Sequence, residues 1–112
     1  MEFPEELVRG SIVPIVLSLL RERPMYGYEI VKLVNARSNG ALEWKEGTLY
    51  PALHRLQEAG KIKSQWRDAP GNEGGRKRKY YTITPSGLSE LSQKVNEWST
   101  FTSAVHRVLG GA

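Results

Sequence analysis

The sequence predicts a mainly α domain of the α+β class, with three short helices, a β-hairpin and one long C-terminal helix. Apolar residues recur at helical spacing within 11–22, 27–38 and 46–60. The segments 61–67 and 78–84 contain alternating or β-branched and aromatic residues, which favour strands. With 112 residues and 39% apolar content, the chain has room for one domain with a modest core.

Residues 1–10 are expected to form an N-terminal arm with at most one short turn at 4–8, residues 11–84 a compact domain and residues 85–110 a separate C-terminal helix. The first helix is expected to start at Ser11, because its hydroxyl can cap free amide groups. Pro14 would then lie in the first turn, where a missing backbone donor costs little.

The next two helices have clear ends in the sequence. Asn39-Gly40 is expected to end the second helix in a left-handed conformation, and Gly60 to end the third. Between them, 42–44 is expected to be a short extended piece. Pro51 costs a backbone hydrogen bond unless the third helix has only just begun, and it stiffens that end of the helix.

Positive charge is concentrated in the predicted hairpin. Seven basic and two acidic residues lie in 61–84 and give this segment a net charge of +5. The whole chain carries +4, so the remaining residues together carry −1. The tip, 68–77, is polar and rich in glycine, which predicts a flexible turn. Such a patch attracts polyanions, although a merely solvated hairpin has the same composition. The basic run 76–79 also resembles a nuclear localisation signal, which its place beside Tyr80 in a hairpin disfavours.

The last helix is expected to begin at Thr84-Pro85, an N-cap followed by proline, and to end at Gly110-Gly111. Its apolar residues follow a heptad pattern interrupted by Thr102, which predicts a seam that meets a second copy of the chain. The expected dimer interface consists of Leu88, Leu91, Val95, Trp98, Phe101, Val105 and Leu109. Phe3 or Leu7 would join it if the arm folds over the partner.

Several classes of protein are disfavoured. The chain has no cysteine, no long uncharged apolar stretch and no basic region at its acidic N-terminus, so we expect an intracellular protein without a membrane span or signal peptide. There is no GxSxG, P-loop or HExxH motif, and His54 and His106 lie far apart without a carboxylate cluster. We therefore expect no enzyme activity, no metal site and no cofactor.

The order helix, helix, helix, strand, basic tip, strand, long helix predicts a winged helix-turn-helix with a C-terminal dimerisation helix. A helix fits the major groove of DNA, while a basic hairpin can follow the neighbouring backbone. One alternative is a winged helix that contacts protein and binds no operator, which weak salt dependence would reveal. Another is single-stranded nucleic acid or RNA binding, which needs exposed stacking aromatics, whereas these are expected to pack inward.

A helical wheel of the third helix places Leu49, Leu53 and Leu56 inward, and the opposite side would meet DNA. Tyr50, Thr48 and His54 can donate hydrogen bonds, and Arg55 can reach a phosphate or a guanine. Any of these could instead be an ordinary surface residue. The residues expected to contact double-stranded DNA are Lys45, Thr48, Tyr50, Pro51, His54, Arg55, Arg76, Lys77 and Arg78.

Three motifs together resemble the PadR family of bacterial transcription regulators: YGYEI at 26–30, EGTLYPALHRLQEAG at 46–60 and KRKYYTITPSG at 77–87. The resemblance covers residues 9–109. It implies a homodimeric repressor that binds a palindromic operator and is often released by a small molecule. The single helix after the hairpin matches the shorter subfamily, so properties of members with an extended C-terminal domain carry over poorly.

Trp98 is the candidate effector residue. The heptad pattern places it on the seam near its symmetry mate, where it could be only a large hydrophobic anchor. Alternatively, two facing indoles leave a slot for a planar aromatic effector. Trp98-Ser99 resembles the drug-binding tryptophan of multidrug-sensing PadR repressors in this respect.

Overall fold

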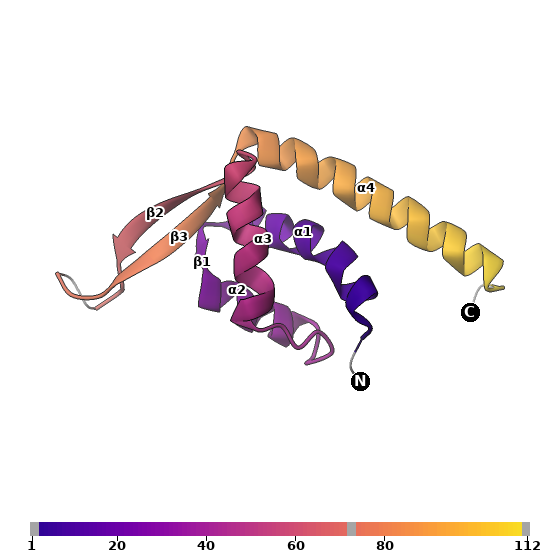
Figure 1. Cartoon of the computed structure of the whole chain (residues 1–112), viewed down its shortest axis with the longest axis horizontal. Coiled ribbons are helices and arrows are strands. Elements are labelled where there is room, and N and C mark those ends of the chain that lie inside the picture. The colour runs from indigo at the N-terminus through magenta and orange to yellow at the C-terminus, as the bar shows by residue number, and fades with distance from the viewer. Residues whose placement is uncertain (1–2, 72–73, 111–112) are drawn as a thin grey trace.

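The computed structural model describes residues 3–71 and 74–110, so parts of the expected arm, hairpin tip and C-terminal stop lie outside it. In chain order it contains α1 (Glu5–Glu22), β1 (Met25–Tyr26), α2 (Gly27–Arg37), α3 (Glu46–Glu58), β2 (Ile62–Asp68), β3 (Lys77–Ile83) and α4 (Pro85–Val108). The molecule measures 58 × 31 × 21 Å. Its hairpin and the C-terminal end of α4 point to opposite ends of the long axis (Figure 1). The predicted winged-helix architecture is confirmed.

One apolar core joins the helices to the base of the sheet. α1, α2 and α3 each contribute a buried stripe, and Met25, Ile62 and Tyr81 close the core from the sheet side. Within α3 the buried residues are Leu49, Ala52, Leu53 and Leu56. Because that stripe is fully used by the core, the opposite side of α3 is left to solvent.

The expectation that the first helix starts at Ser11 is wrong. α1 begins at Glu5, where two glutamates in the first turn complement the helix dipole. The Ser11 hydroxyl caps nothing and instead donates a hydrogen bond to the Val8 carbonyl one turn back (2.7 Å). Pro14 therefore lies in the middle of the helix. Residues 5–10 of the expected arm are helical.

The predicted ends of α2 and α3 are confirmed. Asn39 and Gly40 both have positive φ (53° and 78°), and so does Gly60 (75°). The segment 42–44 forms no strand. Pro51 is the sixth residue of α3, beyond the first turn, so the Gly47 carbonyl lacks its helical amide partner. The sequence suggested that Pro51 would cost no hydrogen bond only at the very start of the helix, and this condition is not met.

The sheet has the order β1-β3-β2, with antiparallel pairing throughout. The short strand β1 was not predicted; it pairs Met25 with Tyr81 and Tyr26 with Tyr80. In the hairpin, Ile62 pairs with Ile83 and Asp68 with Lys77. β1 thereby ties the start of α2 directly to the hairpin.

The start of α4 is joined to the end of α3. The Thr84 hydroxyl accepts from the Gly87 amide (3.1 Å) and donates to the Gly60 carbonyl (2.7 Å). The Thr84 amide donates to the Lys61 carbonyl (3.1 Å). A Cβ on Gly87 would lie 2.1 Å from that same carbonyl oxygen, so the backbones meet closely only because residue 87 is glycine.

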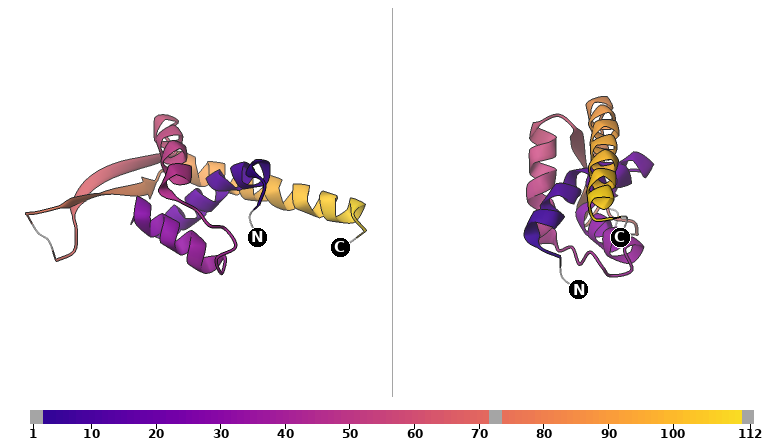
Figure 2. Two further views of the ribbon diagram at one scale, coloured as in Figure 1. Left: turned by 60° about the horizontal axis from the view of Figure 1, so that its bottom comes forward. Right: turned by 90° about the vertical axis from the view of Figure 1, so that its right-hand side faces the viewer.

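α4 runs beside α1 and then continues past it into solvent, as the views of Figures 1 and 2 agree. Leu91, which was predicted to lie on the dimer seam, is 2% exposed and packs in the core of its own chain. It therefore anchors α4 to the domain and has little surface left for a partner. None of the helices in the described ranges is long and apolar enough to cross a membrane.

Candidate nucleic-acid interface

The outer side of α3 exposes most of the residues expected from the helical wheel. Tyr50, Pro51, His54 and Arg55 are exposed and Thr48 is half-buried. Lys45 is the exposed N-cap residue. His54 Nε2 lies 3.2 Å from Glu58 Oε1 one turn along. Arg55 forms no ion pair with any residue in 3–71 or 74–110, so its guanidinium is available to a ligand.

Tyr50 is held in place by α2. Its ring occupies the space that a Cβ on Gly27 would need, with Oη 2.4 Å and Cζ 2.7 Å from that position. Burial raises the pKa of the Tyr50 phenol, with a smaller contribution from Glu46. Tyr50 as a whole nevertheless remains 42% exposed. Tyr50 thus presents one edge to solvent from a fixed position over the first residue of α2.

One face of the hairpin continues the exposed side of α3. A hollow of about 400 Å³ lies between the two, lined by Tyr50, His54, Gln57, Glu58, Lys79 and Tyr81. Burial raises the pKa of the Tyr81 phenol, and Tyr50 adds to that shift. Lys79 Nζ lies 5.8 Å from the centre of the Tyr81 ring and 5.9 Å from that of Trp66. We call this face of the hairpin, with Tyr81, Lys79, Trp66, Lys77 and Asp68, the helix-side face.

The opposite face, here the outer face, carries a second set of aromatic and basic residues. The Arg78 guanidinium lies 4.3 Å from the centre of the Tyr26 ring, and Arg67 lies 5.2 Å from that of Tyr80. Tyr26 and Tyr80 meet edge to face at 5.5 Å. These half-buried tyrosines and the exposed Trp66 contradict the expectation that the aromatics of the sheet pack inward; Tyr81 alone among the hairpin aromatics is buried.

The three basic residues expected to bind DNA from the hairpin are therefore not equivalent. Arg76 is exposed beside the tip. Lys77 is on the helix-side face, but its Nζ lies 2.6 Å from Asp68 Oδ1, and this hydrogen bond lowers the pKa of Asp68. Arg78 is on the outer face against Tyr26. Lys79, which sequence reasoning left out, is the lysine of the helix-side face that forms no ion pair among the described residues.

Strand alternation was the signal that could have separated Lys79 from Arg78. Directly paired residues of antiparallel strands share a face, so Lys79 belongs with Trp66 and Arg78 with Arg67. Alternation alone does not say which of the two sets faces α3.

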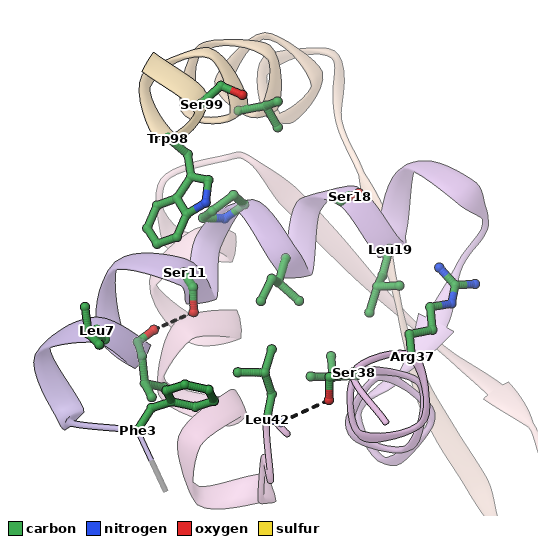
Figure 3. Close-up of a pocket in the computed structure, with 15 residues that line it drawn as sticks. Phe3, Leu7, Ser11, Ser18, Leu19, Arg37, Ser38, Leu42, Trp98 and Ser99 are labelled. Atoms are coloured by element: carbon green, nitrogen blue, oxygen red, sulfur yellow. Dashed lines mark hydrogen bonds between the residues drawn. The ribbon is translucent and has the colours of Figure 1, made fainter. Parts of the chain in front are cut away.

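Trp98 lines an apolar groove of about 690 Å³ between α1, α2, the segment 38–42 and α4. Figure 3 shows its indole pointing from α4 toward α1, with Phe3, Leu7 and Leu42 below it. A Cβ on Gly10 would lie 3.7 Å from the Trp98 ring, so the indole rests on α1 at that glycine. Ser11, Ser18, Ser38, Ser99 and Arg37 supply the polar part of the lining.

The part of the chain that the structure describes has no group of three or more His, Cys, Asp or Glu that could hold a metal ion. The described surface thus consists of an exposed helix, a two-faced basic hairpin, a long apolar helix and the Trp98 groove.

Comparison with known proteins agrees with this arrangement. The model of the transcriptional regulator PadR-like family matches residues 16–93. An uncharacterised protein of Lysinibacillus sphaericus is 39% identical over 94 residues, 84% of each chain. A Clostridium thermocellum transcriptional regulator superposes with a TM-score of 0.82 at 37% identity, over 94% of this chain and 96% of its own. A PadR family regulator of Clostridium difficile does so with 0.74 at 35%, over 88% and 98%. The chain therefore belongs to the PadR-like family of transcriptional regulators.

Proposed function

We propose that the protein is a cytoplasmic repressor that binds a palindromic double-stranded operator as a homodimer and responds to a small molecule. The observation that supports DNA binding best is the position of α3. Its buried stripe is complete within the core, its opposite side is exposed, and a basic hairpin begins four residues after it ends. A helix so presented fits the major groove, with the hairpin over the neighbouring backbone.

Within this proposal the exposed residues of α3 read the operator. Tyr50 and Thr48 donate hydrogen bonds to bases or phosphates, His54 donates from a ring nitrogen, and Arg55 pairs with a guanine or a phosphate. Pro51 keeps the helix end stiff, and Lys45 meets a phosphate near the start of α3. Arg76 and Lys77 add charge from the hairpin, whereas Arg78, which was expected to do the same, stacks on Tyr26 on the outer face.

Dimerisation is supported by the apolar side of α4 that the chain leaves uncovered. The exposed residues on it are Leu88, Val95, Trp98, Phe101, Val105, Val108 and Leu109. Phe3, just before α1, and Leu7 in its first turn line the same groove as Val95 and Trp98. A contiguous apolar surface of this kind is characteristic of an interface. A twofold dimer through α4 would present two copies of α3 to DNA, which explains a palindromic operator.

Selection of bound sequences from random duplex DNA tests this proposal. The expected result is an inverted repeat whose half-site centres lie about one helical turn, roughly 34–36 Å, or a multiple of it apart. Selection of unrelated sequences, with affinity insensitive to salt, would instead indicate the alternative function, a winged-helix module that contacts another protein.

The proposed effector is a planar aromatic compound bound at Trp98. The groove offers room beside the indole, and its lining is mostly apolar with a few hydroxyl groups and Arg37. Such a ligand regulates only if it binds the DNA-competent and incompetent dimers with different affinity. Titration with planar dyes should quench Trp98 fluorescence at micromolar concentrations. Undiminished dye binding by Trp98→Ala, with Trp44 and Trp66 retained, would leave Trp98 as a packing anchor.

A further inference from the structure

Two adjacent pairs of residues in the hairpin have opposite orientations. In β2, Trp66 lies on the helix-side face and Arg67 on the outer face; in β3, Lys79 and Arg78 divide in the same way. The four residues lie at nearly the same level of the hairpin, because Trp66 and Arg67 are neighbours in β2 and Arg78 and Lys79 are neighbours in β3. The two faces therefore differ in what surrounds their side chains and not in how far along the hairpin these side chains lie.

Two of the three basic residues that β2 and β3 place on the outer face, Arg67 and Arg78, lie over aromatic rings, whereas Lys63 lies nearer the base of the hairpin. Arg78 stacks on Tyr26 and Arg67 on Tyr80, and the two tyrosines contact each other. Because β1 links Tyr26 to Tyr80 across the sheet, these contacts attach the hairpin to the start of α2. These contacts between arginines and tyrosines thus have a structural role, and no ligand is needed to explain them.

The helix-side face is different, because one of its two aromatic rings, that of Trp66, is exposed while that of Tyr81 is buried. Trp66 is 63% exposed although its indole is among the largest apolar groups of the chain. Lys79 lies directly across from it, and the ammonium group sits over the ring without a carboxylate partner among the described residues. By contrast, Lys77 on the same face is already paired with Asp68.

This face is continuous with the exposed side of α3. The hollow that joins them is lined by Lys79 and Tyr81 from the hairpin and by Tyr50 and His54 from α3. Figure 1 shows the hairpin leaving the molecule next to α3. A ligand that contacts the exposed side of α3 and extends along the helix-side face of the hairpin would reach Lys79 and then Trp66. Glu58, the carboxylate in the hollow, is beside His54.

We propose that Trp66 and Lys79 form a contact for the DNA backbone, with the indole against the deoxyribose and the ammonium group on a phosphate, while Arg67 and Arg78 on the outer face do not touch DNA. The proposal rests on the proposed operator binding and assigns a side of the hairpin to it. A polyanion of regular form fits an unpaired cation beside a flat apolar ring, because each nucleotide offers one charge and one sugar. Such a contact adds affinity for all sequences equally.

The test compares Lys79→Ala and Trp66→Ala with the matched outer-face variants Arg78→Gln and Arg67→Ala, on the selected operator and on an unrelated duplex. Lys79→Ala should weaken binding to both duplexes about tenfold and flatten the salt slope by about 0.9 units, the value for one lost phosphate contact. Lys79→Arg should restore the slope. Trp66→Ala should weaken binding to both duplexes by a similar factor, about tenfold, without changing the slope.

The outer-face variants should bind within about twofold of the parent, since their charges lie across the sheet and are largely screened. A spectroscopic readout is independent of affinity: DNA should change the tryptophan emission of the parent, and Trp66→Phe should remove most of that change. Unfolding curves of all variants establish that the fold is retained.

Equal losses for Lys79 and Arg78 variants, or losses confined to the outer face, would overturn the assignment. Failure of the parent protein to bind any duplex would instead reject the proposed function. If Trp66→Ala lowered stability while DNA affinity stayed unchanged, Trp66 and Lys79 would be only a cross-strand pair that stabilises the hairpin, and the inference would be wrong.

Discussion

The phenol of Tyr50 occupies the space above Gly27 in which any other residue would place its side chain, with Oη 2.4 Å from the position of an added Cβ. This contact couples the exposed side of α3 to the start of α2. Gly27→Ala should therefore destabilise the fold by about 1–3 kcal/mol, the usual cost of overpacking. Denaturant titration measures the change.

The Tyr50→Ala background gives the control. With the ring removed, Gly27→Ala should cost much less, and the difference between the two backgrounds is the coupling energy. Equal costs in both backgrounds would mean that Tyr50 is not what requires a glycine at residue 27.

Gly87→Ala should disturb the junction between α3 and α4. The added methyl group would lie 2.1 Å from the Lys61 carbonyl oxygen, which belongs to the backbone and cannot rotate away. A loss of about 1–3 kcal/mol or more in unfolding free energy is expected. Gly47→Ala is the matched control, because nothing lies within 4 Å of its added Cβ; it should be neutral or stabilise the helix by up to about 1 kcal/mol. Similar losses for both would contradict the steric argument.

Substitutions at Leu91 and Val105 should distinguish the core of the chain from the proposed dimer interface. Leu91→Ala should lower the free energy of unfolding by about 2–5 kcal/mol, because its side chain is buried within its own chain. Val105→Ser should leave the fold intact and weaken association, as measured by sedimentation over a range of protein concentrations. A fully dimeric Val105→Ser protein would place the interface elsewhere.

Arg55→Ala should weaken binding to the selected operator by about 1–3 kcal/mol, the range for a lost base or paired phosphate contact. Stability should not change, since Arg55 is exposed and forms no ion pair among the described residues. Arg107→Ala, a loss of the same charge in the last turn of α4, is the control. Equal effects of the two changes would indicate long-range charge rather than contact.

Glu22 should make stability depend on pH. Hydrogen bonds from Arg37 (2.6 and 2.8 Å) hold its pKa below the ordinary value of 4.5. Because the folded-state pKa is lowered, the carboxylate contributes its full stabilisation above the unfolded-state pKa and loses it as pH falls from there through the folded-state pKa. The stability difference between the parent and Glu22→Gln should thus shrink between about pH 6 and pH 3. A difference that is constant over this range would contradict the assignment, and Arg37→Gln should show the same pH trend.

The features that the sequence predicted well are those that depend on neighbouring residues. Asn39, Gly60 and the Thr84-Pro85 pair ended or began helices as expected, because capping and left-handed turns are local. The start of α1 was wrong because Ser11 has the chemistry of a cap but lies inside a longer helix, where its hydroxyl bonds the preceding turn.

Features that depend on distant segments were missed. β1 is only two residues long and exists because β3 lies beside it, so it has no periodicity of its own. A heptad position looks the same whether it meets its own domain or a partner, which is why Leu91 was assigned to the wrong surface. The faces of the hairpin could be separated only once the pairing of Trp66 with Lys79 and the position of α3 were known.

The shared hydrogen bonds of Thr84 give the molecule the geometry of a lever. α4 has 24 residues and is pivoted at its first turn on the carbonyl groups that end α3. At about 1.5 Å per residue its far end lies roughly 36 Å from that pivot. A rotation of 5° about Thr84 would therefore move the end of α4 by about 3 Å, nearly the width of a methyl group, and would move the contacts of Leu91 and Trp98 with the domain by less, in proportion to their distance from Thr84.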